Sequence, residues 1–182
     1  MIVGLCGTAG SGKDAAAAHL TAHHGYTRRA FADPMRTALY ALDPLVTTGA
    51  AVFRLAELVD RVGWDAAKQH PDVRRMLQRF GTEVGRDQWG EDFWVQRATG
   101  DLHPGDAVVF TDVRFPNEAA AVAALGGIVV EIRRPGVHLE ATVAAHASEA
   151  MAFDRDAVVV NDDTLATLHE RLMAVVGAVP VG

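Results

Sequence analysis

A glycine-rich segment near the start of the sequence has the residue types and spacing of a phosphate-binding loop. It reads Gly7-Thr8-Ala9-Gly10-Ser11-Gly12-Lys13 and fits the pattern G-x-x-x-x-G-K. Glycines let backbone N–H groups turn toward an anion, and the lysine adds a compact charge at the β- and γ-phosphates of a nucleotide. We predict that the segment binds a nucleoside triphosphate, and the alternative is a glycine-rich turn without a ligand.

Asp14 follows the lysine at a position where this pattern usually has Ser or Thr. A carboxylate beside bare phosphates would be repelled, whereas Mg²⁺ between them makes the arrangement favourable. We therefore predict that Asp14 belongs to the shell of a bound Mg²⁺, either directly or through water. The alternative is an acid in the first turn of a helix, which the helix dipole stabilises by about 0.3–1 kcal/mol.

A second acid, Asp112, ends the apolar run "AVVFTD". In α/β sheets ligands lie at the carboxyl ends of the strands, so we predict that Asp112 binds Mg²⁺ or activates an acceptor. The alternative is that it caps the turn into the next helix. Arg114 would project toward the same edge, while Asn117 and Glu118 stand at a helix start, where capping is the expected role.

Two adjacent arginines, Arg133 and Arg134, end another apolar run and precede Pro-Gly. Arginines at the edge of a lid neutralise charge on a phosphoryl group in transfer, and we predict this role for the pair. We expect one of them to touch substrate and the other to be a solvated surface charge. His146 and Glu149 lie in a segment without a clear pattern, and a structural role is expected for His146.

Strand-like and helix-like segments alternate along the chain. Apolar or extended runs occupy 1–7, 27–32, 107–112, 128–136 and 157–162, and helical patterns occupy 13–24, 33–42, 116–125 and 163–177. This alternation predicts an α/β fold with a parallel sheet covered on both faces. Asp33 is expected to cap one helix, and Asp162 or Asp163 another.

The stretch 52–100 shows helical spacing and no convincing strand, and residues 43–51 are expected to form a loop. This block is longer than one crossover between strands needs. We therefore predict one domain with a helical substrate-binding insertion at about 43–104 and a lid region at about 134–155.

Composition limits the classes of partner. The 182 residues carry a net charge of −6, and no basic run exceeds a pair of arginines, which argues against a long nucleic-acid groove. The single cysteine, Cys6, cannot form an internal disulfide and favours a reducing cytoplasm. No signal peptide and no apolar run of membrane-spanning length is visible, so no membrane partner is expected.

Several separated segments together resemble the phage-type deoxynucleoside monophosphate kinases, a branch of the P-loop nucleoside monophosphate kinases. They are "GSGKD", "FADPMR", "RRMLQRFGTEVGRDQWGEDFWV", "TDVRFPNEAAAV", "IRRPG", "HASE" and "VVVNDDTLATL", in the order of the family. The resemblance implies a three-layer P-loop kinase fold with a parallel sheet, a helical insertion that binds the monophosphate and a short lid. It also implies ATP and Mg²⁺, and transfer of a phosphoryl group from ATP to a deoxynucleoside monophosphate.

The resemblance also assigns residues to the two nucleotides. "NDDTL" is similar to a segment found near the adenine of ATP in related kinases, which implicates Asn161 and Asp162, although Asp163 replaces a glycine of that pattern. The acceptor phosphate is expected at Arg36 and Arg86, with Arg75 and Arg79 as further candidates or solvated helix arginines. Three roles stay open for Trp89 and Trp94: stacking on the base, lining the base pocket, or packing within the insertion.

Two other functions stay open at this point. A kinase with the same phosphate loop could act on another small acceptor, such as dephospho-coenzyme A or a phosphorylated metabolite. A nucleotide-binding switch with slow hydrolysis is the third alternative, although it would not need a second substrate pocket. Whether two copies associate as a homodimer is also left open.

Overall fold

The computed structural model describes residues 1–49, 51–136 and 152–178 in two units. Unit 1 comprises Met1–Phe31 and Thr99–Gly182, and unit 2 comprises Ala32–Ala98. Both the glycine-rich loop and the carboxylates that follow strands belong to unit 1, whereas most of the arginines assigned to the acceptor belong to unit 2.

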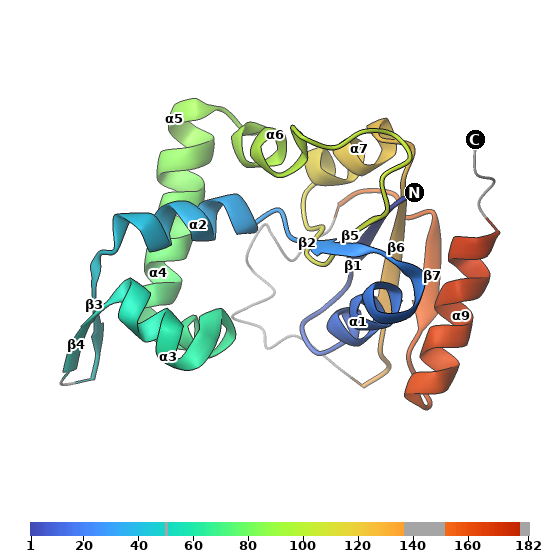
Figure 1. Ribbon diagram of the computed structural model, residues 1–182, viewed down its shortest axis with the longest axis horizontal. Coiled ribbons are helices and arrows are strands. Elements are labelled where there is room, and N and C mark those ends of the chain that lie inside the picture. Colours follow the sequence, from blue (N-terminus) through green and yellow to red (C-terminus); the bar gives the residue numbers. More distant parts are fainter. Residues whose placement is uncertain (50, 137–151, 179–182) are drawn as a thin grey trace. The chain divides into compact units, whose positions relative to one another are not determined.

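Unit 1 is organised around a parallel sheet of five strands in the order β2-β5-β1-β6-β7 (Figure 1). The strands are β1 (Ile2–Cys6), β2 (Thr27–Arg29), β5 (Val108–Phe110), β6 (Ile128–Arg133) and β7 (Ala157–Val160). The central strand β1 is buried along its whole length, as an apolar strand between two parallel neighbours should be. The predicted α/β class with a parallel sheet is confirmed.

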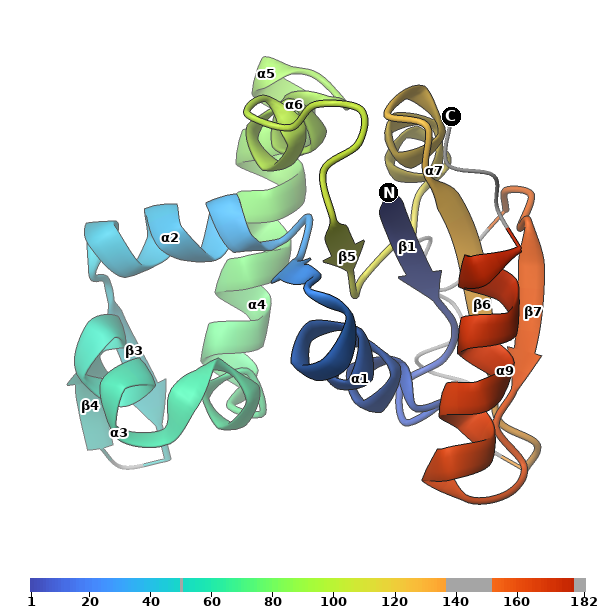
Figure 2. The same ribbon diagram turned by 45° about the vertical axis from the view of Figure 1, so that its right-hand side comes forward.

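Helices cover both faces of this sheet. They are α1 (Lys13–His24), α7 (Pro116–Ala124) and α9 (Leu165–Gly177), and Figure 2 shows α1 and α9 at the same face. Val3 and Leu5 share a buried core with α1 and α9. On the opposite face a Cβ at Gly4 would lie 3.1 Å from Val122 of α7, so α7 packs directly on the strand backbone. The alternating side chains of β1 thus separate three layers.

Unit 2 contains a β-hairpin that the sequence pattern did not predict. β3 (Leu45–Thr48) and β4 (Ala51–Arg54) pair antiparallel, so the expectations of a loop at 43–51 and of no strand after 52 were wrong. The strands have only four residues each, and Leu45 and Val52 are exposed, so apolar periodicity carried little signal. Val46 is fully buried and anchors the hairpin in the core of unit 2.

The helices α2 (Asp33–Leu42), α3 (Leu55–Ala67) and α4 (Pro71–Arg79) contribute buried residues to that core. The short helices α5 (Asp87–Trp89) and α6 (Phe93–Thr99) follow in the chain. Between α4 and α5 the segment η1 (Phe80–Arg86) is a π-helix, whereas the sequence suggested only an interruption at Gly81. Glycine permits this close packing, because a Cβ at Gly85 would lie 2.0 Å from Nε1 of Trp94.

Helix caps differ in part from the predicted ones. Ala32 precedes α2, so Asp33 is the first helical residue instead of the cap, and Pro34 follows it. α9 is capped by Thr164, whose hydroxyl accepts from the N–H of Thr167, and neither Asp162 nor Asp163 holds that position. The capping role of Glu118 is confirmed, since its carboxylate accepts from the N–H of Phe115.

Candidate functional site

The glycine-rich loop leaves β1 after Cys6 and enters α1 at Lys13. Gly7, Gly10 and Gly12 all have positive φ angles, of 130°, 77° and 108°, which L-residues rarely adopt. A Cβ at Gly7 would also lie 2.2 Å from the carbonyl oxygen of Ile132 in β6. The loop therefore requires glycine for its conformation and for its close approach to the neighbouring strand.

Lys13 closes over this loop. Its Nζ donates to the carbonyl oxygens of Gly7 and Thr8, each at 2.8 Å. Ser11 is fully buried, and among the described residues its hydroxyl has no hydrogen-bond partner. A buried hydroxyl without a partner is costly, so it fits a site where a ligand oxygen arrives. The glycines, the ammonium and this hydroxyl together fit a nucleotide phosphate.

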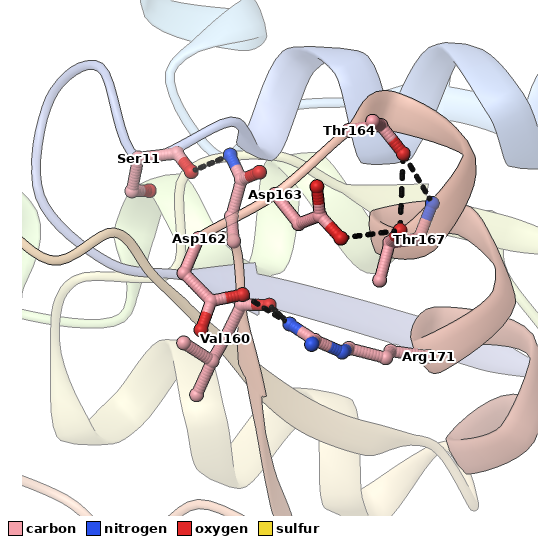
Figure 3. A network of polar contacts seen from close by, with 8 residues as sticks. Ser11, Val160, Asp162, Asp163, Thr164, Thr167 and Arg171 are labelled. Atoms are coloured by element: carbon pink, nitrogen blue, oxygen red, sulfur yellow. Dashed lines mark hydrogen bonds and ion pairs between the residues drawn. The ribbon is translucent and has the colours of Figure 1, made fainter.

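The end of β7 supports the loop from the side. The side-chain amide of Asn161 donates to the carbonyl oxygen of Ser11 at 2.8 Å, and the Asn161 backbone N–H donates to the carbonyl of Arg133. In Figure 3 a dashed line marks the hydrogen bond that the carbonyl oxygen of Ser11 accepts. Asn161 thus links the loop to β6, and these two hydrogen bonds give it a structural role at the end of β7.

Asp162 turns toward α9 instead of toward the loop. Its carboxylate accepts from Arg171 at 2.7 Å, and Arg171 also donates to the carbonyl of Val160 (Figure 3). This contact lowers the pKa of Asp162 below its ordinary value. Asp163 accepts from the hydroxyl of Thr167. These two acids therefore order the turn before α9, and the adenine contact assigned to Asp162 remains a prediction.

The two candidate metal ligands lie at the carboxyl edge of the sheet or next to it. Asp14 is exposed in the first turn of α1. Asp112 follows β5, and its Oδ1 accepts from the N–H of Phe31 at 2.7 Å. The next residue, Val113, donates to Leu5 of β1. Within the described ranges no three His, Cys, Asp or Glu side chains form a metal cluster.

Arg133 is the last residue of β6, and Arg134 follows it at an exposed position. Arg133 forms a two-pronged ion pair with Glu131, whose carboxylate raises the pKa of the Arg133 guanidinium. Arg155 lies 3.3 Å from the same carboxylate. Glu131 and Arg155 were not among the predicted site residues, although a charged residue inside the apolar run "IVVEIR" was a usable signal. Arg114 is exposed, and its backbone N–H donates to Glu118.

The arginines assigned to the acceptor all have polar contacts within unit 2. Arg36 lies 3.4 Å from Asp33, Arg79 donates to Glu83, and Arg86 donates to the carbonyl of Glu91; Arg75 pairs with Asp72. Arg75 and Arg79 border an open pocket of about 360 Å³ over α2, α4 and η1, which also has an apolar lining. Asp72 and Glu83, which pair with these two arginines, line the pocket as well, so an organic anion bound there would compete with them.

The two tryptophans differ in their surroundings. Trp94 is 7% exposed, and its Nε1 donates to the carbonyl of Gly81 at 2.9 Å, as expected of a packing residue. Trp89 is 54% exposed and lies 4.6 Å from the ring of Phe93, so it has a free aromatic surface. His146 and Glu149, together with most of the predicted lid, lie outside the described residues.

Comparison with known proteins identifies the family. Residues 47–172, more than half of the chain, match the family described as deoxynucleotide monophosphate kinase. The chain belongs to the deoxynucleotide monophosphate kinase family. The predicted resemblance and the assignment as a nucleotide kinase are thereby confirmed.

Two viral relatives carry the same description. A candidate deoxynucleotide monophosphate kinase of Acanthamoeba polyphaga mimivirus is 28% identical over 202 residues, which cover 97% of this chain and 96% of the relative. The deoxynucleotide monophosphate kinase of Enterobacteria phage T4 is 30% identical over 107 residues, or 55% of this chain and 43% of the phage protein. Among solved structures, a dephospho-CoA kinase from Campylobacter jejuni matches with a TM-score of 0.40 and 14% identity, covering 97% of this chain and 95% of that one.

The described part of this kinase contains no helix of the length and apolarity needed to cross a bilayer.

Proposed function

We propose that this kinase transfers the γ-phosphoryl group of ATP to a deoxynucleoside monophosphate and releases a deoxynucleoside diphosphate and ADP. The observation that carries the proposal is a phosphate-binding loop with three left-handed glycines and Lys13, in a chain that belongs to this family. The loop supports the binding of ATP as the phosphoryl donor, and the family membership supports a deoxynucleoside monophosphate as the acceptor.

The donor triphosphate binds at the loop. Backbone N–H groups of Gly7, Ala9, Gly10, Ser11 and Gly12 are the proposed phosphate donors, and the amino end of α1 adds its dipole. Lys13 exchanges its two loop carbonyls for phosphate oxygens when nucleotide arrives. The adenine lies near Asn161 and Asp162 in this proposal, because both follow β7 beside the loop.

The acceptor binds through cations of unit 2. Arg36 and Arg86 are the proposed contacts of its phosphate, and Arg75 and Arg79 are the further candidates. Each of these arginines has an anionic or carbonyl partner in the protein, so an arriving phosphate would compete with that partner. Trp89 is the better candidate for stacking on the base, since Trp94 is buried.

In the proposed reaction an oxygen of the acceptor phosphate attacks the γ-phosphorus of ATP. A new P–O bond forms as the bond to the bridging β–γ oxygen breaks, and ADP leaves with that electron pair. Lys13, Arg133 and Arg134 stabilise the charge on the phosphoryl oxygens, and Arg114 assists at the same edge. Asp14 and Asp112 are the residues that would hold Mg²⁺, which when bound neutralises phosphate charge.

The proposal also concerns where the enzyme works. We infer that it acts on free nucleotides and not on nucleic acid, because the net charge is −6. A reducing cytoplasm suits the buried free thiol of Cys6.

A panel of acceptors tests this function. Purified protein is incubated with ATP and Mg²⁺ and each of the deoxynucleoside monophosphates, the ribonucleoside monophosphates, dephospho-coenzyme A or no acceptor, and products are separated by chromatography. The proposal expects a diphosphate from at least one deoxynucleotide, and little ADP without an acceptor. Product from dephospho-coenzyme A alone, or ADP formation independent of any acceptor, would overturn it. Lys13→Met is the matched inactive control, because it keeps the length of the side chain without its charge.

A further inference from the structure

Glu131 is a carboxylate inside an otherwise apolar strand. Its side chain is 12% exposed, and it lies in register with Cys6, the last residue before the phosphate loop. Removing a carboxylate from water costs free energy unless cations or hydrogen-bond donors compensate. The partners of Glu131 therefore indicate what its position serves.

Glu131 holds two guanidinium groups from different parts of the chain. Arg133 donates Nε–H to Oε1 at 3.0 Å and Nη2–H to Oε2 at 3.1 Å. Arg155 lies with its Nε 3.3 Å from Oε2. Arg155 is further fixed by Phe153, whose ring centre is 5.4 Å from the guanidinium carbon. One carboxylate thus accepts two hydrogen bonds from Arg133 and forms an ion pair with Arg155 at the carboxyl end of β6.

Among the described residues, the ion pairs of this cluster join two guanidiniums to the single carboxylate of Glu131. The side chain of Arg155 is only 29% exposed, so water screens its charge incompletely. A partly buried guanidinium that is held in place is suited to contact an anionic ligand.

The cluster lies directly behind the phosphate loop. The carbonyl of Ile132, between Glu131 and Arg133, would be 2.2 Å from a Cβ at Gly7. Burial raises the pKa of the Cys6 thiol, while a hydrogen bond from Arg155 and the charges of Arg155 and Lys13 oppose that rise. Lys13 donates to the carbonyl of Gly7, the residue after Cys6, and Cys6 is in register with Glu131, so the loop lysine and the cluster lie at the same end of the sheet.

We propose that Glu131 is a positioning residue that holds Arg155 and Arg133 for the terminal phosphate of the bound nucleoside triphosphate, and that Arg155 contacts that phosphate. The inference deepens the proposed function, because it requires a triphosphate at the loop. It adds a cation beyond Lys13 and the pair Arg133–Arg134. It also gives the buried acid a function besides joining β6 to the segment before β7.

The test compares the affinity for ADP with that for a non-hydrolysable ATP analogue, each measured by calorimetry with Mg²⁺. A contact with the terminal phosphate affects the analogue and not ADP. Arg155→Met should therefore lower the ratio of the two affinities by about tenfold or more. Arg155→Lys should restore part of the ratio at most, because an ammonium lacks the fork that serves carboxylate and phosphate together.

Glu131→Gln separates positioning from charge. The substitution removes a negative charge beside the site, so electrostatics alone would tighten binding of the analogue. The positioning role predicts the opposite result: a ratio lowered by about threefold or more, and a lower kcat of transfer, because the two guanidiniums lose their common anchor. Glu57→Gln and Arg61→Met are matched controls, since they break an exposed pair on α3 at 4.0 Å and should leave the ratio unchanged.

The outcomes distinguish this inference from the proposed function. A ratio within about twofold of the wild-type value in both Arg155→Met and Glu131→Gln, even with a lower melting temperature, would mean a purely structural cluster and overturn the inference. If the wild type binds neither nucleotide, both proposals fail. If it binds the analogue, shows these ratios and yet phosphorylates no deoxynucleotide, the assigned acceptor is wrong and the role of Arg155 stands.

Discussion

The contact between Gly12 and Asn161 allows a quantitative test of how the phosphate loop is built. A Cβ at Gly12 would lie 2.5 Å from Nδ2 of Asn161, the atom that donates to the carbonyl of Ser11. Gly12→Ala therefore meets two costs: a left-handed alanine at φ 108°, and displacement of the Asn161 amide. Gly10→Ala is the matched control, because Gly10 has φ 77° and no atom within 4 Å of its Cβ position.

The magnitudes follow from these two costs. A left-handed alanine costs about 1–2 kcal/mol, which is all that Gly10→Ala should lose. Losing the buried hydrogen bond adds about 1–3 kcal/mol, so Gly12→Ala should lose about 2–5 kcal/mol. At about 2–4 °C per kcal/mol for a chain of this size, the melting temperature should fall by about 2–8 °C in Gly10→Ala and about 4–20 °C in Gly12→Ala.

A double-mutant cycle with Asn161→Ala isolates the contact. Once the amide is absent, Gly12→Ala should cost only the backbone term, so the double variant should lose about 1–3 kcal/mol less than the sum of the single variants. Urea unfolding of the four proteins measures this coupling. Additive losses, within about 0.5 kcal/mol, would refute the reasoning that Asn161 and Gly12 share one packing constraint.

Three further predictions concern other parts of the chain. Asp72→Ala should loosen the hairpin, because it removes the carboxylate that accepts from the N–H of Thr47 at 2.9 Å, and hydrogen exchange at that amide should accelerate by about tenfold. Gly85→Ala should destabilise unit 2 by about 1–3 kcal/mol, since its Cβ would overlap the indole of Trp94, and the tryptophan fluorescence should shift to the red; an unchanged spectrum and stability would contradict this packing. The pKa of His19 is lowered from 6.5 by burial and by neighbouring histidines. As the pH falls, the unfolded chain therefore binds this proton before the folded chain does, and the free energy of unfolding should decrease below about pH 6.5. His19→Gln should flatten that fall in thermal melts between about pH 7 and pH 5, and an equally steep fall would count against the assignment.

The sequence was most informative where local pattern and fold agree. The apolar strand, the glycines and the helix that begins at Lys13 follow each other directly in the chain, so their arrangement could be predicted without long-range contacts. The same holds for the helix after Pro116, whose capping acid Glu118 is three residues from the cap. Such features depend on neighbours within one turn.

Features that depend on distant residues could not be predicted in this way. Glu131 and Arg155 meet only because β6 and β7 pair, and the register of that pairing is not visible in either segment. The short hairpin β3–β4 is fixed by burial of Val46 within unit 2, although its other side chains give no clear alternation. The π-helix reflects close packing of Gly85 on Trp94, which lies beyond the helical segment itself.

Transfer of isotope from ATP labelled at the γ-phosphate measures the central claim most directly. The labelled nucleotide is incubated with enzyme, Mg²⁺ and the best deoxynucleoside monophosphate, and the products are separated. We predict that the label moves into the β-phosphate of the deoxynucleoside diphosphate in step with ADP formation, and that Lys13→Met abolishes both. Label recovered as inorganic phosphate, with the acceptor unchanged, would contradict this claim.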